Sequence, residues 1–404
     1  KPAIRFKGFT DSWEQRKLGD VVNRVTRKNQ DLVSELPLTI SAQYGLIDQN
    51  EFFDKRVASK DVSGYYLIEN GEFAYNKSTS TDAPWGAVKR LDHYENGVLS
   101  TLYIVFGIKE NNPIDSNFLV SYYNTNLWHK GIREIAAEGA RNHGLLNIVP
   151  ADFFETELMI PQDIEEQKQI GKFFKELEAL ITLHQRKYDK LQIIKKAMLE
   201  KMFPQNGSCF PEIRFKGFTD SWEQRKLGEL GEIMTGSTPS TSKSEYYSED
   251  GIPWVTPTDI NSQTISDTPR KLSGEGIKVG RVVPANTILC TCIASIGKNT
   301  LLTVKGSFNQ QINCLTPNEY NDAYFLLTES EIWSNIMKRM AAAGTMQIVN
   351  KTEFSELTTM VPKLEEQKKI GQYFHTIGHL ITLHQREVEK LQNIKKSMLE
   401  TMFV

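Results

Sequence analysis

The segment from Glu165 to Phe203 reads EEQKQIGKFFKELEALITLHQRKYDKLQIIKKAMLEKMF, and it returns from Glu365 to Phe403 as EEQKKIGQYFHTIGHLITLHQREVEKLQNIKKSMLETMF. In both copies apolar residues recur every three or four positions, the period of a helix with one apolar face. Heptad spacing of this length favours a coiled coil of about 40 residues and roughly 60 Å. The sequence therefore predicts two long helices of one kind, and each is the simplest partner for the other.

The predicted apolar seam is interrupted once in each copy, by Lys187 and by Glu387. A two-fold axis between two such helices would make them antiparallel. His184 and His384 occupy the same seam position, where packing in the seam is favoured over a switch or a metal site. The seam members are Ile170, Phe173, Leu177, Leu180, His184, Leu191, Ile194 and Met198 in the first copy, and Ile370, Tyr373, Ile377, Leu380, His384, Leu391, Ile394 and Met398 in the second.

A second repeat shows that the whole chain is built twice. IRFKGFTDSWEQRKLG spans Ile4–Gly19 and returns letter for letter at Ile213–Gly228, whereas Asp20–Ile164 and Glu229–Leu364 have little sequence in common. Such a repeat indicates a dimer fused into one polypeptide. We expect an α+β protein in which two variable domains are separated by two long helices that form an antiparallel coiled coil, with internal pseudo-two-fold symmetry. The expected boundaries are 1–163 for the first domain, 164–204 for the first helix, 205–363 for a linker and the second domain, and 364–404 for the second helix.

The two variable stretches share a pattern although their letters differ. Short β-branched and aromatic runs alternate with Gly, Pro, Asn and Asp in both, which is typical of an irregular sheet. The glycines of Gly97-Val-Leu-Ser and Gly306-Ser-Phe-Asn keep the offset of the opening repeat. One helix is predicted late in each stretch, around Asn117–Ala137 and Ala323–Ala343. Both domains are therefore expected to share one fold.

Composition is that of a globular protein, with 39% hydrophobic and 24% charged residues among 404. No apolar run approaches a membrane span and no secretory leader opens the chain, so a cytoplasmic location is expected. The net charge is −2, and Asp20–Ile164 holds 20 acidic against 13 basic residues. This bulk charge argues mildly against DNA binding, although base reading depends on local groups.

Motifs for catalysis and for metal binding are absent from the sequence. The four cysteines form no CxxC pair and have no histidine at zinc-ligand spacing, so neither a disulfide nor a metal site is expected. Ser295-Ile-Gly-Lys298 lacks the glycine spacing and the final Ser or Thr of a phosphate-binding loop. Asn111-Asn-Pro-Ile114 lacks the second proline and the aromatic residue of the adenine methyltransferase tetrapeptide. The sequence therefore predicts no catalytic site and no cofactor in this chain.

Several strings, in the same order in both halves, carry a resemblance to a known family. They are WEQRKLGD (Trp13–Asp20), WEQRKLGE (Trp222–Glu229), GEIMTGSTPST (Gly231–Thr241), GIPWVTPTDI (Gly251–Ile260), FNQQINCL (Phe308–Leu315) and VPKLEEQKKIG (Val361–Gly371). With two variable domains and two repeated arms, the chain resembles the specificity subunit of type I restriction-modification systems over essentially its whole length. The first variable domain departs from the common pattern, since it reads LTISAQYGLIDQ and FAYNKSTSTDAPWGAV where the second has IPWVTPTDI, and it resembles another branch of the same domain type.

The resemblance implies a non-catalytic, DNA-binding protein whose two target-recognition domains each read one half of a split, asymmetric site. Its implied partners are double-stranded DNA, two methyltransferase subunits docked on the repeated arms, and restriction subunits. Adenine N6 methylation and cleavage would occur in those partners, which would bind S-adenosylmethionine, ATP and Mg²⁺. The helices would set the unread gap between the half-sites.

Base contacts are expected from polar residues in loops, because Arg and Lys suit guanine while Asn and Gln suit adenine. A solvated loop or a turn cap is an equally good interpretation of each one singly. For Trp85 and Trp254, core packing is favoured over DNA contact. The candidates are Asn76, Lys77, Ser78, Thr79, Arg141, Asn142 and His143 in the first domain, and Ser237, Thr238, Thr258, Lys298, Gln310, Gln311, Thr345 and Gln347 in the second.

Two other functions remain open from the sequence. A two-armed protein scaffold would bind all duplexes alike, and an unusual single-chain nuclease or methyltransferase would show activity without partners. The repeated polar face of the arms, with Gln167, Lys168, Gln185 and Arg186, is either solvated or a docking face for a protein bound identically in both halves.

Overall fold

The computed structural model describes residues 1–41, 44–81, 83–111, 114–136, 145–205, 207–343 and 348–404. These residues form two compact units. The first joins Lys1–Leu183 to Val388–Val404, and the second is His184–Glu387. Each unit therefore holds one variable domain together with parts of both long helices.

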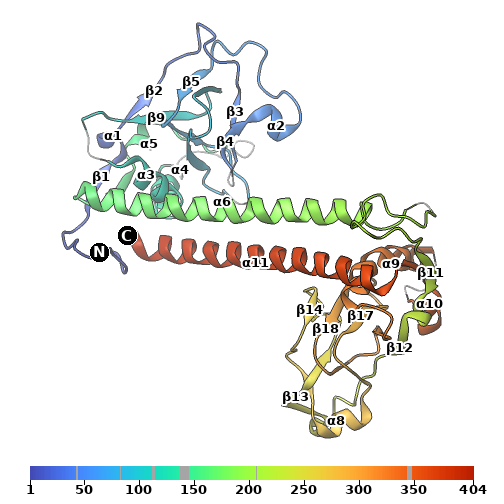
Figure 1. Ribbon diagram of the computed structural model, residues 1–404. Coiled ribbons are helices and arrows are strands. Elements are labelled where there is room, and N and C mark those ends of the chain that lie inside the picture. Colours follow the sequence, from blue (N-terminus) through green and yellow to red (C-terminus); the bar gives the residue numbers. More distant parts are fainter. Residues whose placement is uncertain (42–43, 82, 112–113, 137–144, 206, 344–347) are drawn as a thin grey trace. The chain divides into compact units, whose positions relative to one another are not determined.

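The two predicted helices are present as α6 (Ile164–Lys201) and α11 (Leu364–Met402) (Figure 1). In the first unit Glu178 of α6 forms an ion pair with Lys395, near the end of α11. In the second unit Phe203, just beyond α6, packs on Phe374, near the start of α11. The helices are therefore antiparallel in both units, which confirms the predicted coiled coil.

The seam between the helices is continuous, and the predicted interruption was wrong. Phe174 and Ile181 are buried where the sequence pattern suggested Phe173 and Leu180, and Leu180 is 46% exposed. Val388 is buried and Tyr188 is half-buried, so neither Lys187 nor Glu387 holds a seam position. The pattern misled because apolar residues stand side by side at 173–174 and 180–181. Phe173 faces the opening segment instead, with its ring centroid 6.1 Å from that of Phe6.

Both variable domains are built on the same antiparallel sheet. The strand order is β2-β9-β6-β7 in the first unit and β12-β20-β17-β18, extended by β14, in the second. This match confirms that the two domains share a fold. In the first unit the strands and helices are β1 (Glu14–Lys17), α1 (Leu18–Val21), β2 (Val22–Val25), β3 (Leu38–Ser41), β4 (Gly45–Asp48), α2 (Gln49–Phe53), β5 (Tyr66–Glu69), β6 (Phe73–Asn76), β7 (Ala87–Arg90), β8 (Asn96–Leu99), β9 (Ile104–Ile108), α3 (Ser116–Tyr123), α4 (His129–Ala136), α5 (Pro150–Phe154) and β10 (Glu157–Ile160).

The second domain differs mainly in its smaller sheet, where β13 runs parallel to β19. A parallel bridge between Pro37 and Val98 holds the corresponding place in the first domain. The elements of the second domain are β11 (Glu223–Lys226), α7 (Leu227–Leu230), β12 (Gly231–Thr235), a 3₁₀ turn (Ser244–Tyr246), β13 (Tyr247–Val255), β14 (Thr264–Ile265), β15 (Lys271–Leu272), α8 (Gly274–Val279), β16 (Val282–Val283), β17 (Thr287–Thr291), β18 (Asn299–Leu302), β19 (Gly306–Phe308), β20 (Ile312–Pro317), α9 (Ala323–Ala343), α10 (Lys351–Glu356) and β21 (Thr358–Val361).

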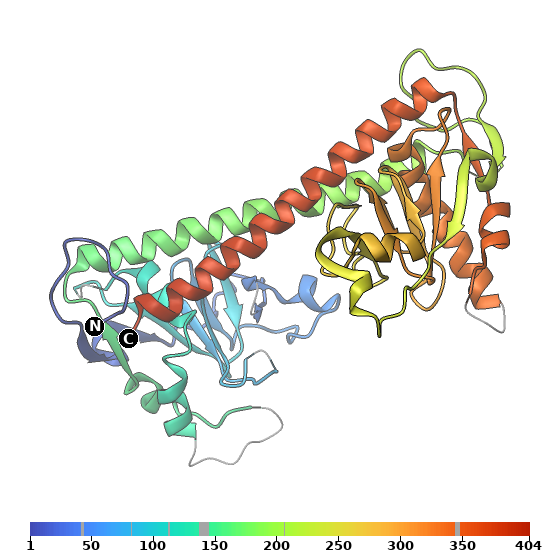
Figure 2. The same cartoon turned by 90° about the horizontal axis from the view of Figure 1, so that it is seen from below.

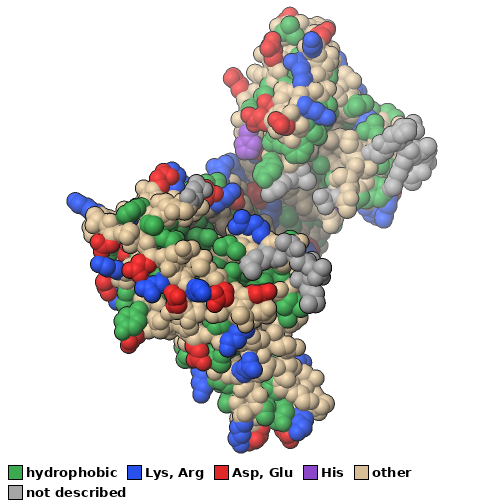
Figure 3. All heavy atoms as spheres, turned by 90° about the vertical axis from the view of Figure 1, so that its right-hand side faces the viewer, with side chains coloured by type: hydrophobic (Ala, Val, Ile, Leu, Met, Phe, Trp, Pro, Cys, Tyr) green, Lys and Arg blue, Asp and Glu red, His purple; other side chains and the backbone are tan. Residues whose placement is uncertain are grey.

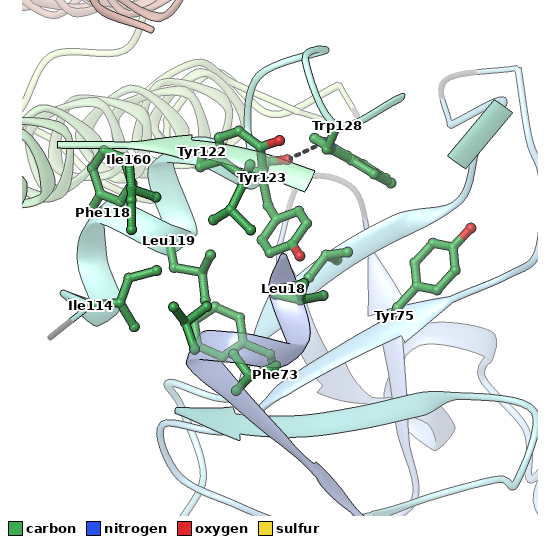
Figure 4. Close-up of a cluster of buried hydrophobic side chains, with 14 of the residues drawn as sticks. Leu18, Phe73, Tyr75, Ile114, Phe118, Leu119, Tyr122, Tyr123, Trp128 and Ile160 are labelled. Carbon is green, nitrogen blue, oxygen red and sulfur yellow. Dashed lines mark hydrogen bonds between the residues drawn. The ribbon is translucent and has the colours of Figure 1, made fainter. Parts of the chain in front are cut away.

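The core of the first domain lies between the sheet and helices α3 and α4 (Figure 4). Phe73 and Phe106 stack with centroids 5.4 Å apart, and Tyr75 stacks on Phe153 at 4.8 Å. Trp128 donates its indole N–H to the Tyr123 carbonyl oxygen at 3.2 Å. Burial of such rings is worth about 2 kcal/mol each, so these side chains fix the sheet against the helices.

The predicted helix around Asn117–Ala137 is broken in two, whereas the one at Ala323–Ala343 is continuous. Helix α3 ends at Tyr123, and α4 begins at His129. The Thr125 hydroxyl donates to the Tyr122 carbonyl oxygen at 2.7 Å and accepts from the backbone N–H of Leu127. Such local side-chain bonds compete with the helical ones and end the helix.

Each domain is closed by the end of the long helix that follows the other domain. Phe403, just beyond α11, packs against Trp13 and Phe118 in the first unit, at 6.0 and 5.5 Å between centroids. Phe203 packs against Trp222 and Phe325 in the same way, both at 5.8 Å. The first unit thus takes part of its core from the last residues of the chain.

The two ends of the chain lie side by side in the first unit (Figure 2). The Ile4 N–H donates to the Thr401 carbonyl oxygen at 3.0 Å, and in the second unit Ile213 donates to Lys201 at 2.8 Å. The repeated opening segment is thereby tied to the end of a repeated helix in both units. The same contact at repeat-equivalent positions is what the predicted pseudo-two-fold symmetry requires.

Repeated polar residues anchor each domain on its helix. The Arg5 guanidinium donates to both oxygens of the buried Glu166 carboxylate at 2.5 and 2.7 Å, and Arg214 does so to Glu366 at 2.7 and 2.7 Å. Gln167 is buried, contrary to the predicted polar face. Its side chain accepts from the Asp115 N–H at 2.8 Å and donates to the Pro161 carbonyl oxygen at 2.8 Å.

Gly171 allows the close approach of α3 to α6. A Cβ atom there would lie 2.5 Å from the backbone nitrogen of Phe118, which is closer than real contacts allow. At the repeat-equivalent Gly371, a Cβ atom would lie 2.7 Å from the backbone nitrogen of Phe325.

Among the described residues, no helix has the length and apolar character needed to span a membrane.

Candidate nucleic-acid interface

In the first domain the described candidates lie in one segment, Asn76–Thr79, which is the last residue of β6 and the loop that follows it. The Asn76 side chain accepts from the Ser78 N–H at 3.0 Å and shapes the turn. The Lys77 carbonyl oxygen accepts from the Leu146 N–H at 3.0 Å, and Ser78 forms a bridge with Leu145. The loop is thus paired with the segment that begins at Leu145.

Lys77 is the half-buried cation of this loop. Its ammonium group is 3.5 Å from the Ile148 carbonyl oxygen. Burial lowers the pKa of the Lys77 side chain from its ordinary value. An anion arriving beside it would raise this pKa again, because a neighbouring opposite charge favours the charged form.

In the second domain four candidates gather at one edge. Thr238 hydrogen-bonds through its hydroxyl to the Gln310 side-chain oxygen. The Ser237 N–H donates to the Phe308 carbonyl oxygen at 2.9 Å, and the Gln311 N–H donates to the Asn309 side-chain oxygen at 3.0 Å. The structure therefore brings together Ser237, Thr238, Gln310 and Gln311, with Thr238 and Gln310 exposed.

Thr258 and Lys298 lie in two other loops. The Thr258 hydroxyl is 2.8 Å from that of Thr256, and within the described residues no hydrogen bond joins it to the four clustered residues. Lys298 is exposed, and its N–H donates to the Thr291 hydroxyl at 2.9 Å. The Gln311 carbonyl oxygen accepts from the Cys292 N–H at 2.8 Å, which connects the cluster to the chain just after β17.

The loop after β6 has a structural counterpart in the loop after β17. Ile293 bridges to Ile348 as Ser78 bridges to Leu145, and the Val349 N–H donates to Cys292 at 2.9 Å as Leu146 does to Lys77. The missed counterpart residues are Ala294 and Ser295, both exposed. Ala294 has a φ of 63°, a conformation that non-glycine residues adopt rarely and that often marks functional loops.

Arg281 is a second residue that sequence reasoning missed. Its N–H donates to the Ser237 hydroxyl at 2.9 Å and its guanidinium donates to the Thr235 carbonyl oxygen. It places a positive charge beside the four clustered candidates. No sequence signal marked it, because it lies 44 residues from Ser237, directly before strand β16.

Five of the predicted candidates lie outside the described residues: Arg141, Asn142, His143, Thr345 and Gln347.

Both tryptophans considered in the sequence are at least half-buried. Trp254 is buried and donates its indole N–H to the Ser237 carbonyl oxygen at 3.1 Å, whereas Trp85 is half-buried and packs at the edge of the core.

Charge on the surface is mixed, since Lys and Arg alternate with Asp and Glu on the face in Figure 3.

No group of three His, Cys, Asp or Glu side chains suited to a metal ion occurs among the described residues. Cys290 is buried beside Met337, and burial raises the pKa of its thiol well above the ordinary value, which leaves it an inert core residue.

Comparison with known proteins gives the family. Residues 10–192 and 219–393 match the model of the type I restriction modification DNA specificity domain. The HindI specificity subunit of Haemophilus influenzae is 29% identical over 214 residues, which are 50% of this chain and 46% of that subunit. The chain thus spans about half the length of that relative.

A longer match covers 97% of this chain and 93% of the putative MjaX specificity subunit of Methanocaldococcus jannaschii, at 22% identity over 406 residues. The crystal structure of a type I S subunit from M. genitalium has a TM-score of 0.68, at 14% identity and covering 100% of this chain and 99% of that one, so the fold is shared. The domain model matches twice, once for each variable domain and its helix. The chain belongs to the family of type I restriction-modification specificity subunits.

Proposed function

We propose that the chain reads a bipartite, asymmetric DNA sequence, with one half-site for each variable domain. It directs adenine N6 methylation and restriction by partner subunits. The observation that carries the proposal is the pair of matched loops after β6 and β17, which keep the same backbone bonds and differ in side chains. A shared frame with different side chains suits two domains that read different bases.

The candidate residues supply the chemistry for base reading. Gln310 and Thr238 lie together and exposed at one edge, and Arg281 is bound next to Thr238, its backbone N–H on the Ser237 hydroxyl and its guanidinium on the Thr235 carbonyl oxygen. Glutamine suits adenine and arginine suits guanine in the major groove. The first domain would use the loop Asn76–Thr79 in the same role.

The chain itself is proposed to be non-catalytic and to bind no cofactor. S-adenosylmethionine, ATP and Mg²⁺ would be bound by the partner subunits. Exposed leucines at identical positions in both arms support docking of two identical methyltransferase subunits. These are Leu180 and Leu183 in α6, and Leu380 and Leu383 in α11, each 36% exposed or more. Exposed apolar side chains of this kind are common at protein interfaces.

Methylation mapping tests the proposal directly. N6-methyladenine would be located in DNA from cells that carry the chain with its neighbouring methyltransferase gene, and in cells that lack only this chain. We expect a split motif that disappears with the chain. An unchanged methylation pattern, with the complex shown to assemble, would instead favour a two-armed protein scaffold.

A further inference from the structure

A basic groove of about 910 Å³ lies in the second unit, between the end of α6 and the helix α9. Five of its lining side chains are cations and two are carboxylates, Glu200 and Glu331. The lining also includes small polar side chains that can donate hydrogen bonds, among them Asn261, Ser262 and Asn335. The groove therefore combines net positive charge with hydrogen-bond donors.

The cations of the groove come from three separate segments. Lys195 and Lys196 belong to α6, Lys298 precedes β18, and Lys338 and Arg339 belong to α9. Gly297 permits the convergence, since its φ is 82° and a Cβ atom there would lie 3.0 Å from the Cε atom of Lys338. The turn that presents Lys298 is thus packed directly on α9.

Most of this charge is unpaired. Lys195 forms an ion pair with Glu331. Within the described part of the chain, no carboxylate forms an ion pair with Lys196, Lys298 or Lys338. The Arg339 guanidinium donates to the Asn335 carbonyl oxygen at 3.2 Å, and it has no carboxylate partner among the residues that the structure describes. Because the five cations outnumber the two carboxylates, the excess positive charge favours the binding of an anion.

We propose that this groove binds phosphates of the DNA backbone next to the half-site read by the second domain. The inference rests on the proposed function and adds a part to it, because phosphate contacts fix the register of a protein on DNA without reading bases. Lys298, which the sequence suggested as a base contact, is reassigned to a phosphate. Base reading is left to the cluster of Thr238, Gln310 and Arg281.

The repeat supplies the argument for DNA over a docked protein. The equivalent hollow in the first unit is lined by Lys395 and Lys396 but also by Glu178 and Glu400, so its charges balance. A partner that docked on the repeated arms would meet the same helix residues in both units. The excess charge of the groove comes instead from Lys298, Lys338 and Arg339, which belong to the second variable domain alone.

The test measures DNA binding as a function of salt. The full chain, in its methyltransferase assembly, would be titrated with a duplex carrying the mapped site and with one whose second half-site is scrambled. The test variant is the triple substitution Lys196→Gln, Lys298→Gln and Lys338→Gln. Controls are Lys396→Gln, which changes the equivalent residue of the balanced hollow, and Lys305→Gln, an exposed lysine outside the groove.

We expect the triple variant to bind both duplexes more weakly, by about fivefold per lost contact at 0.15 M salt, with a salt slope shallower by about one per contact. The preference for the mapped site would stay unchanged, and both controls would bind like the wild type. If the triple variant kept the salt slope of the wild type, the proposal that this groove binds phosphates would be wrong. Equal loss of methyltransferase assembly in Lys196→Gln and Lys396→Gln would overturn it in favour of protein docking. A wild-type protein that does not distinguish the two duplexes would instead refute the proposed function.

Discussion

The Nδ1 atom of His184 lies 3.1 Å from the Nδ1 atom of His384. The two residues occupy the same position of the repeated helices, 200 residues apart. When equivalent residues meet, a two-fold axis between their helices passes between them. One ring must donate its proton while the other accepts, so at least one of the two imidazoles is neutral in this contact.

Acid should weaken this contact. Partial burial, the charge of His184 and the charge of Lys187 lower the pKa of His384 from its ordinary value. The unfolded chain then binds protons more readily than the folded one, so the free energy of unfolding falls as the pH drops below about 6.5. Urea unfolding at pH 7, 6 and 5 measures this. The double variant His184→Gln, His384→Gln should lose less stability over that range, and parallel losses in both proteins would exclude the pair as the cause.

Glu329 should produce the opposite pH dependence. Its carboxyl group is buried, accepts a hydrogen bond from the Thr359 hydroxyl, and has its pKa raised by burial to about 8. The folded state therefore holds a proton that the unfolded state releases near pH 4.3. Stability falls as the pH rises from there to about 8, by a few kcal/mol at most.

The variant Glu329→Gln isolates this effect, because an uncharged amide of similar shape does not titrate. Unfolding measured at pH 6 and pH 8.5 should show the wild type losing stability between the two values and the variant losing less. At pH 8.5 the variant should be the more stable protein. A wild type with equal stability at both values would show that Glu329 is not held protonated in the folded state.

Removing the ring of Phe403 should destabilise the first domain, although this residue lies near the far end of the chain. Phe403 is 5% exposed and contacts Trp13 and Phe118. Truncation of such a ring to Ala costs about 3 kcal/mol. Phe203→Ala is the matched variant, since its ring contacts Trp222 and Phe325 in the second domain.

Hydrogen exchange distinguishes the two variants, because it reports each domain separately. Phe403→Ala should speed exchange in the strands β6 and β9 of the first domain and leave β17 and β20 unchanged. Phe203→Ala should do the reverse. If both variants affected the same domain, the assignment of each helix end to one core would be wrong.

The large features of the fold could be predicted from the sequence because they are repeated or periodic. The heptads gave the two antiparallel helices, and the invariant opening block located the two domains. The prediction of local detail failed where two neighbouring residues could each fill one seam position, as with Phe173 and Phe174. It failed again at Thr125, where a hydroxyl bond to the Tyr122 carbonyl oxygen ends a helix that the apolar pattern would have continued.

The candidate site was predictable only in part, for a related reason. Loops rich in polar residues were visible in the sequence, and the cluster around Gln310 follows from them. The basic groove was not visible, since Lys196, Lys298 and Lys338 come from three segments more than 30 residues apart and no periodicity joins them. Convergence of that kind depends on how α9 packs on the Gly297 turn.

Exchange of Asp20–Ile164 for the corresponding segment of another specificity subunit should change one half of the recognised sequence and leave the other half intact. The donor segment has to keep Phe118, because its ring packs against Phe403 outside the exchanged part. Mapping of N6-methyladenine in cells carrying the hybrid gives both half-sites. A change in both halves would contradict independent reading by the two domains.

Lengthening both long helices should change the gap and not the bases. One heptad inserted beside His184 in α6 and one beside His384 in α11 keeps the 3-4 spacing of the seam, so the antiparallel pairing is preserved. Seven residues add about 10 Å of helix, which corresponds to roughly three base pairs of duplex. We expect a methylated motif with the same half-sites and a longer gap. Insertion into α6 alone is the control, because it puts the seam out of register and should abolish methylation. An unchanged gap in the double insertion would mean that the helices do not set the distance between the half-sites.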